Sequence, residues 1–326
     1  MLVLSRADVE SLIDLDQLRS GVARAMADLS AGRASMPSRI AASVPERGGL
    51  LAAMPAYLPS SGALTTKLVS LFPRNVDRPT HQAVIVVFDA DTGTPVALMD
   101  GEAITAARTA AASALATDLL ARRDARILAV IGSGVQARAH LRAVPRVRDF
   151  AEVRVAAHHR EKAEALANDA RAWLGDRVRA VPTYREAANG ADVVSAATHS
   201  PEPVVRREWL SPGSHVTSVG YNTAGREVDG ATFRDALVVV ESRAATLAPP
   251  PAGSNDIAMA VAEGYMKGDG VHAELGEIVS GARPGRTEAA QITLYKSVGV
   301  AVQDAAAAAL VLEAARKRGV GRELEL

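Results

Sequence analysis

An apolar run, RILAVI (126–131), passes directly into Gly132-Ser133-Gly134-Val135-Gln136-Ala137, and a helical pattern follows. The turn fits G-x-G-x-x-A, in which the first glycine permits a tight turn and the second lets backbone approach a pyrophosphate. A small third residue lets the helix pack on the strand, with its N-terminus facing the anion. Glycines also occur in purely structural turns, but the flanking strand and helix favour dinucleotide binding here.

Segments of strand and helix character alternate over residues 126–242, which is typical of a parallel, doubly wound sheet. The expected strands are 126–131, 152–157, 191–198, 215–220 and 236–242. Upstream, helical spacing over about residues 5–32, opened by a capping box of Ser5 and Asp8, gives way to a period of two over about 36–101. This change predicts an antiparallel sheet after an opening helix.

An alanine-rich helix is expected at about 102–122, and a last helix from about Ser297 to Arg318. The predicted fold class is therefore α/β, a Rossmann-type doubly wound parallel sheet domain joined to an α+β domain. We expect residues 119–296 to form the dinucleotide-binding domain. It is inserted between the two parts of the second domain, residues 1–118 and 297–326.

The bulk composition excludes several classes of partner. Lys plus Arg and Asp plus Glu both number 37, so no nucleic acid or anionic membrane is expected as a partner. The best apolar candidate for a membrane span, AAAAALVL at 305–312, is too short to cross a bilayer. Without cysteine there is no disulfide or thiol nucleophile, which favours the cytoplasm, and the scattered histidines predict no metal site.

The end of the second expected strand indicates which dinucleotide binds. A carboxylate there usually holds the ribose hydroxyls of NAD, and it would repel the 2′-phosphate of NADP. This chain has Ala157-His158-His159-Arg160, and no carboxylate before Glu161. The same residues would be found if they were only solvated cations of a loop, but His158 and Arg160 can also bind a 2′-phosphate. We therefore favour NADP(H), with NAD(H) as the alternative.

Several long stretches resemble the ornithine cyclodeaminase/mu-crystallin family over nearly the whole chain. They are MPAYLPSSGALTTKLVSLFPRN (54–75), residues 79–117, IGSGVQARAH (131–140), GADVVSAAT (190–198), residues 275–286, and TLYKSVGVAVQDAAAA (293–308). The resemblance implies a homodimer with a Rossmann domain and a separate substrate and dimerisation domain, here 1–118 with 297–326. The family includes ornithine cyclodeaminases, alanine dehydrogenases, cyclic ketimine reductases and opine-type amino-acid dehydrogenases.

The candidate substrate-binding residues are cations in apolar surroundings. Lys67 lies in an alternating apolar strand and Arg108 in a helix of small residues, where a charge is costly unless it meets an anion. Rim salt bridges would explain them too, but the resemblance implies that Arg39, Lys67 and Arg108 bind the carboxylate of a small amino or imino acid. It also places a cofactor-phosphate contact at Thr109. Further dinucleotide contacts are expected at Val135, Gln136, Thr198, Val219, Arg226 and Ser297.

One departure from the cyclodeaminase pattern concerns the reaction. The position of the catalytic aspartate in that pattern is Asn222, within Gly220-Tyr221-Asn222-Thr223-Ala224-Gly225-Arg226-Glu227-Val228-Asp229. An amide cannot exchange a proton in the working pH range, although it can hydrogen-bond a substrate nitrogen or water. Glu227 and Asp229 are expected to serve the next turn and helix cap. Met54 and the PTHQA segment with His81 resemble the mu-crystallin branch.

These features predict an NAD(P)H-dependent reductase of cyclic imino acids, such as pyrroline- or piperideine-2-carboxylate. A protonated imine needs no acid from the protein, so this reaction tolerates Asn222 better than deamination does. The alternatives are an ornithine cyclodeaminase, for which His81 is the candidate acid–base group, and an opine or linear amino-acid dehydrogenase. The remaining alternative is a non-catalytic protein that binds NADPH and a small ligand.

Overall fold

The computed structural model describes residues 1–222 and 224–325, which divide into two compact units. Unit 1 comprises residues 1–108 and 300–326, and unit 2 comprises 109–299. The first boundary falls between residues 108 and 109, inside helix α3 (Gly101–Leu120), which runs unbroken through it. No described helix is long and apolar enough to cross a membrane.

Unit 1 is built on a seven-stranded sheet in the order β15-β1-β6-β5-β4-β3-β2. All neighbouring strands are antiparallel except β1 and β6. Its strands are β1 (Leu2–Leu4), β2 (Ile40–Val44), β3 (Gly49–Leu58), β4 (Ala63–Leu71), β5 (His81–Phe88), β6 (Pro95–Asp100) and β15 (Arg322–Glu323). The sequence predicted the antiparallel region, but not the two short strands β1 and β15 near the chain ends.

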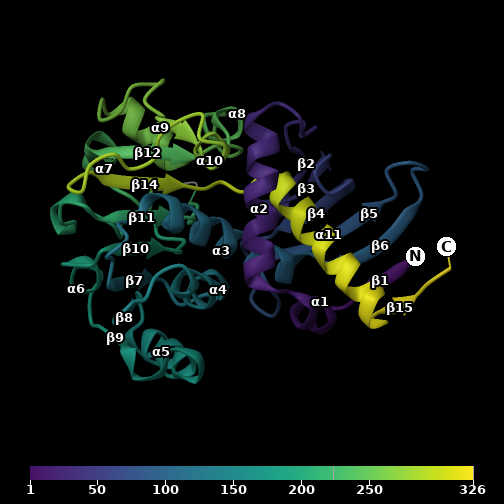
Figure 1. Ribbon diagram of the computed structural model, residues 1–326, viewed down its shortest axis with the longest axis horizontal. Coiled ribbons are helices and arrows are strands. Elements are labelled where there is room, and N and C mark those ends of the chain that lie inside the picture. Colours follow the sequence, from purple (N-terminus) through teal and green to yellow (C-terminus); the bar gives the residue numbers. More distant parts are fainter. Residues whose placement is uncertain (223, 326) are drawn as a thin grey trace. The chain divides into compact units, whose positions relative to one another are not determined.

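The helices of unit 1 cover one face of this sheet. They are α1 (Arg6–Leu12), α2 (Leu15–Ser30) and α11 (Ala301–Arg318), and α11 packs on β3, β4 and β5 (Figure 1). The predicted capping box of Ser5 and Asp8 opens α1. The prediction of a single opening helix is wrong. The Asp14 side chain accepts hydrogen bonds from the N–H groups of Asp16 and Gln17 and so starts a second helix, α2. The last helix begins at Ala301 rather than Ser297.

Unit 2 holds an all-parallel sheet in the order β13-β12-β14-β11-β10-β7-β8-β9. The strands are β7 (Ile127–Ile131), β8 (Glu152–Ala156), β9 (Val178–Ala180), β10 (Val193–Ala196), β11 (His215–Ser218), β12 (Ala236–Val240), β13 (Ala273–Glu274) and β14 (Ile292–Lys296). Strand order reverses at β7, which lies between β8 and β10, so the sheet has the switch point of a Rossmann-type fold.

Alternate residues of these strands enter two apolar clusters, one on each side of the sheet. Leu128 and Val130 belong to one cluster, and Ala129 and Ile131 to the other. Burial on both sides explains why the strands read as nearly continuous apolar runs. The covering helices are α4 (Val135–Ala143), α5 (Arg160–Leu174), α6 (Tyr184–Ala188), α7 (Gly230–Asp235), α8 (Arg243–Thr246), α9 (Asn255–Ala262) and α10 (Leu275–Val279).

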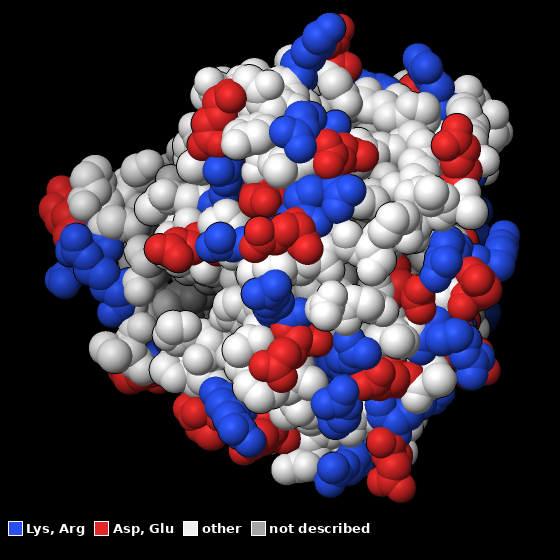
Figure 2. All heavy atoms as spheres, turned by 90° about the vertical axis from the view of Figure 1, so that its left-hand side faces the viewer, with Lys and Arg blue, Asp and Glu red and all other residues white. Residues whose placement is uncertain are grey.

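Strand β14 is the main element absent from the sequence-based expectation. It is fully buried between β11 and β12, yet it is only five residues long and ends in a charged residue, Lys296. That pattern resembles neither an alternating nor a purely apolar strand. On the face shown in Figure 2, basic and acidic side chains are interspersed and neither sign forms a broad patch.

Candidate active site

The three sequence-predicted residues Met54, Lys67 and His81 lie on the helix-covered face of the unit 1 sheet. Met54 pairs with Lys67 across β3 and β4, and Lys67 pairs with Ile85 across β4 and β5. Because side chains alternate along a strand, His81 shares the face of Ile85. Lys67 is only 3% exposed, so its charge needs a partner inside the protein.

That partner is Asp304, in the first turn of α11. Its Oδ2 lies 2.9 Å from Lys67 Nζ, and its Oδ1 accepts a hydrogen bond of 3.0 Å from Arg108 Nε. Arg108 Nη1 also donates to Gln303 Oε1 at 3.0 Å. All four side chains are buried. Two cations therefore share one carboxylate, and Asp304 and Gln303 were not among the residues predicted from the sequence.

The charges in this cluster do not cancel. Burial and the positive charges of Arg108 and Arg39 together lower the pKa of Lys67 to about 8, against the opposing effect of Asp304. Burial raises the pKa of Asp304, but the nearby Arg108 and Lys67 charges outweigh it and hold that pKa below its ordinary value. Two buried cations thus share one carboxylate, with Arg39 adding positive charge nearby, and this arrangement favours a small anionic ligand.

His81 lies within electrostatic reach of this cluster. Burial lowers its pKa, and the positive charge of Lys67 lowers it further. The imidazole is therefore neutral near pH 7, when it can accept a proton or donate its single N–H. Glu102, on α3, and Asp304 are nearby charges that act in the opposite direction.

The glycine turn of unit 2 has the geometry that a pyrophosphate requires. Gly132 has φ +126°, and a Cβ there would lie 2.4 Å from the carbonyl oxygen of Ala197 after β10. Gly134 is the N-cap of α4, where no side chain caps the helix and a Cβ would meet nothing within 4 Å. Open space beside uncapped N–H groups at the switch point fits a dinucleotide phosphate.

The residues after β8 lie where the sequence places them. His158, His159 and Arg160 are exposed, with the two imidazole rings in edge contact at 4.8 Å. Arg160 Nε donates to Glu164 Oε1 at 2.8 Å, one turn along α5. The strand end itself carries no carboxylate, and Glu161 is exposed on α5.

The other expected dinucleotide contacts are mostly engaged within unit 2. Val135 is exposed at the start of α4, while Thr109 is buried on α3 and Val219 and Gln136 are half-buried. Three further side chains bind carboxylates of the protein: Thr198 binds Glu227, Arg226 pairs with Glu263, and Ser297 donates to Glu241. These contacts organise the carboxyl ends of β10, β11 and β14.

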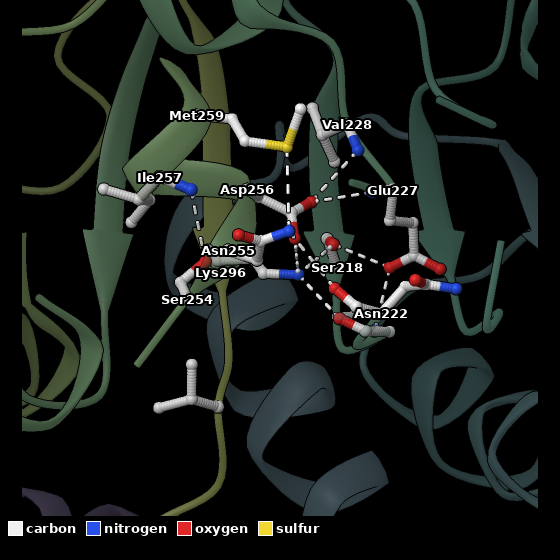
Figure 3. Close-up of polar contacts among 12 residues, drawn as sticks. Ser218, Asn222, Glu227, Val228, Ser254, Asn255, Asp256, Ile257, Met259 and Lys296 are labelled. Atoms are coloured by element: carbon white, nitrogen blue, oxygen red, sulfur yellow. Dashed lines mark hydrogen bonds and ion pairs between the residues drawn. The ribbon is translucent and has the colours of Figure 1, made fainter. Parts of the chain in front are cut away.

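A second buried charge cluster fastens those strand ends (Figure 3). Lys296 Nζ lies 3.1 Å from Asp256 Oδ2 and donates to Ser218 Oγ at 3.0 Å and to the carbonyl of Gly220 at 2.8 Å. Asp256 Oδ1 also accepts from the backbone N–H groups of Glu227 and Val228. Glu227 accepts from Thr198, Ser218 and the Gly220 N–H. The loop after β11 is therefore held from both sides.

Asn222 lies on this loop, and both polar atoms of its side chain contact backbone groups of this loop and of the loop after β10. Nδ2 donates to the carbonyl of His199 at 2.8 Å, and Oδ1 accepts from the Ala224 N–H at 2.8 Å. An aspartate could make the second contact but not the first. The expected structural roles of the downstream acids are confirmed, since Glu227 braces the loop and Asp229 caps α7 through the Thr232 N–H.

Charged residues in apolar surroundings were the signal that drew attention to Lys67 and Arg108. The same signal is present in TLYKSVGVAVQDAAAA, where Lys296 and Asp304 interrupt small and apolar residues. Among the described residues, no group of three or more His, Asp or Glu side chains is arranged to hold a metal ion.

Comparison with known proteins decides the family. The model of the ornithine cyclodeaminase/mu-crystallin family matches residues 1–319. The chain belongs to this family. It is 39% identical over 285 residues to the ketimine reductase mu-crystallin of Mus musculus, covering 86% of each chain.

Two solved structures share the family fold along the whole chain. One is the Δ1-pyrroline-2-carboxylate reductase of Thermococcus litoralis in complex with NADH and L-proline, with 41% identity, a TM-score of 0.94 and coverage of 99% of this chain and 100% of that one. The other is an archaeal alanine dehydrogenase dimer with bound NAD, with 32% identity, a TM-score of 0.91 and coverage of 100% and 99%.

Proposed function

We propose that this protein is an NAD(P)H-dependent reductase of cyclic imino acids of the pyrroline- or piperideine-2-carboxylate type. The observation that carries the proposal is the buried cation cluster, in which Lys67 and Arg108 share the single carboxylate of Asp304. The names of the relatives agree with it, because a ketimine reductase and a pyrroline-2-carboxylate reductase are among the similar proteins.

In this proposal Arg39, Lys67 and Arg108 bind the substrate carboxylate and fix the ring. Arginine suits this task because its guanidinium can hold a carboxylate through parallel hydrogen bonds. When bound, the reduced nicotinamide supplies the hydride. The imine nitrogen arrives with its proton from water, so hydride addition to the carbon completes a secondary amine, and no group of the protein must lose a proton.

Asn222 supports reduction over cyclodeamination. Removing ammonia from ornithine requires proton transfer at the amine, and an amide that spans His199 and Ala224 cannot supply it. Neutral His81 remains the candidate acid–base group for that rival reaction.

We further propose that NADP(H) is preferred, with His158 and Arg160 receiving the 2′-phosphate. The absence of a carboxylate at the end of β8 supports this assignment. In a direct comparison, kcat/KM with NADPH should exceed that with NADH by about tenfold or more, and Arg160→Ala should reduce the difference. Equal values for both dinucleotides would contradict the assignment.

A homodimer is proposed through the outer face of the unit 1 sheet, which α11 leaves uncovered. This face carries apolar residues at the sheet positions that alternate with the core, including Leu51, Tyr57 and Val84 at 50, 38 and 41% exposed. Light scattering should give twice the chain mass, and Leu51→Glu should release monomer. We place the reaction in the cytoplasm, since the chain contains no cysteine to form disulfides.

The first experiment follows NADPH absorbance with purified protein and piperideine-2-carboxylate or pyrroline-2-carboxylate. We expect substrate-dependent NADPH loss that disappears in Arg108→Ala. Arg24→Ala, which removes an exposed arginine of α2 in the same unit, should leave the rate unchanged. Ammonia release from ornithine without net NAD reduction would instead identify a cyclodeaminase, and NADPH binding without turnover of any of these substrates would identify a binding protein.

A further inference from the structure

We propose that Asp304 is a positioning residue that keeps Lys67 protonated and aims Lys67 and Arg108 at the substrate carboxylate. The inference rests on the proposed function, because it assigns the cation cluster to that carboxylate. It adds a residue that itself repels the substrate yet is required for its binding at and above neutral pH.

The geometry gives each oxygen of Asp304 one cation. Oδ2 lies 2.9 Å from Lys67 Nζ, and Oδ1 accepts from Arg108 Nε at 3.0 Å. Asp304 is 1% exposed and lies in the first turn of α11, where the helix dipole stabilises a negative charge. Gln303, beside it, accepts from Arg108 Nη1. One turn of one helix thus orients both cations.

The cations keep hydrogen-bond donors for a ligand. The Lys67 ammonium has three N–H groups, and Asp304 is its only ion-pair or hydrogen-bond partner over residues 1–222 and 224–325. In the same part of the chain, Arg108 uses Nε and Nη1 toward Asp304 and Gln303, which leaves Nη2. A carboxylate bound here would find donors from both residues already aimed.

The charges around Lys67 show why Asp304 matters. Its strand neighbours Met54 and Ile85 are uncharged, while Arg39 before β2, Arg108 on α3 and His81 on β5 are cationic or neutral. Glu102 on α3 acts on His81 and pairs with Arg6. Asp304 is the one described carboxylate in contact with Lys67, so removing it exposes this ammonium to arginine charges alone.

Two opposing consequences follow when Asp304 becomes asparagine. Where Lys67 stays protonated, loss of a negative charge leaves carboxylate binding equal or stronger. At higher pH the variant Lys67 releases its proton, since the pKa of about 8 depends on Asp304, and binding weakens. The ratio of variant to wild-type Kd therefore rises with pH. A purely structural role would change Kd by one factor at every pH.

The test uses the full-length chain saturated with NADPH and pyrrole-2-carboxylate, an anion that does not titrate between pH 6 and 9. Calorimetry should give an Asp304→Asn to wild-type Kd ratio near or below 1 at pH 6 and about 5 to 10 at pH 8 to 9. Asp304→Glu should restore much of the wild-type pH dependence. Asp28→Asn, which removes a buried carboxylate paired with Arg33 in the same unit, should give a constant ratio. A constant ratio for Asp304→Asn overturns the proposal.

A second measurement requires no ligand and keeps the proposal testable if the proposed function fails. The chain has five lysines, so ¹³Cε-lysine labelling gives few NMR signals, and Lys67→Arg assigns one of them. In Asp304→Asn the Lys67 pKa should fall by about 1 or more below the wild-type value. Equal titration in both proteins overturns the inference. If Asp304→Asn does not fold, Lys67→Arg replaces it in the binding test. Lys67→Arg should abolish the weakening of pyrrole-2-carboxylate binding above pH 8, and weakening that persists in this variant overturns the inference.

Discussion

Each unit of this protein contains a buried lysine paired with an aspartate, but the two pairs are completed differently. In unit 2, Lys296 contacts Asp256, Ser218 and the Gly220 carbonyl, which match its three N–H groups. In unit 1, Lys67 has Asp304 as its one described partner. The third charged member of the cluster is Glu227 in unit 2 and Arg108 in unit 1. The unit 2 cluster therefore has surplus hydrogen-bond acceptors, and the unit 1 cluster has surplus donors.

This difference separates a cluster that holds a loop from a cluster that can hold a ligand. The excess negative charge of Glu227 is consumed by N–H and O–H groups at the ends of β10 and β11. In unit 1, the described polar partners of Lys67 and Arg108 are Asp304 and Gln303. A buried lysine is therefore informative only when all of its donors are counted.

The largest effect is expected from Lys296→Met. The substitution leaves Asp256 and Glu227 buried without their cation, which costs about 3–5 kcal/mol. For a unit of this size, thermal melting should shift down by about 10 °C. Lys67→Met should shift the melt by much less, because Arg108 still pairs with Asp304. Equal shifts would remove the distinction between the two clusters.

Activity should rank the same two variants in the opposite order. Lys67→Met removes a buried charge from the proposed carboxylate site, so kcat/KM for the imino acid should fall about 100-fold, or roughly 3 kcal/mol. Measured below its melting temperature, Lys296→Met should lose less. Steady-state kinetics on the folded fraction tests this, and a Lys67→Met enzyme with wild-type kcat/KM would refute the assignment.

Acid should destabilise unit 2 more than unit 1. His140 and His215 are fully buried there, and burial lowers their pKa values to about 4 and about 3. Both are neutral when folded but take up protons when unfolded below about pH 6.5, so stability falls as pH drops below that value. Each should remove about 1–2 kcal/mol between pH 7 and 5. Hydrogen exchange should localise the loss, and uniform loss across both units would contradict it.

The smallest effects are expected from substitutions of the uncharged residues in the two clusters. Gln303→Leu removes one acceptor from Arg108 and should lower kcat/KM about fivefold, near 1 kcal/mol, with little change in melting. Ser218→Ala removes a bridge between Lys296 and Glu227 and should lower the melting temperature by a few degrees. A reversed pattern, with Ser218 controlling activity and Gln303 stability, would show that the clusters had been assigned the wrong way round.

Local patterns predicted the parts of this protein that local physics determines. The glycine turn, the capping box at Ser5 and the apolar strands of the parallel sheet follow from spacing alone. Strand β14 was missed because its burial depends on neighbours far along the chain. Asp304 was missed for the same reason, since its contact with Arg108 spans 196 residues and α11 reads locally as an alanine-rich helix. Asn222 was identified, but its two backbone contacts depend on a neighbouring loop.

The long separation between Arg108 and Asp304 also has a consequence during synthesis. Unit 2 is one continuous segment, whereas unit 1 needs α11 from the end of the chain. A ribosome that adds about 5–20 residues per second produces Asp304 about 10–40 s after Arg108. Through that interval Asp304, the described carboxylate that pairs with both Lys67 on β4 and Arg108 on α3, has not yet been made. Helix α11 completes a unit most of whose sheet precedes unit 2 in the chain.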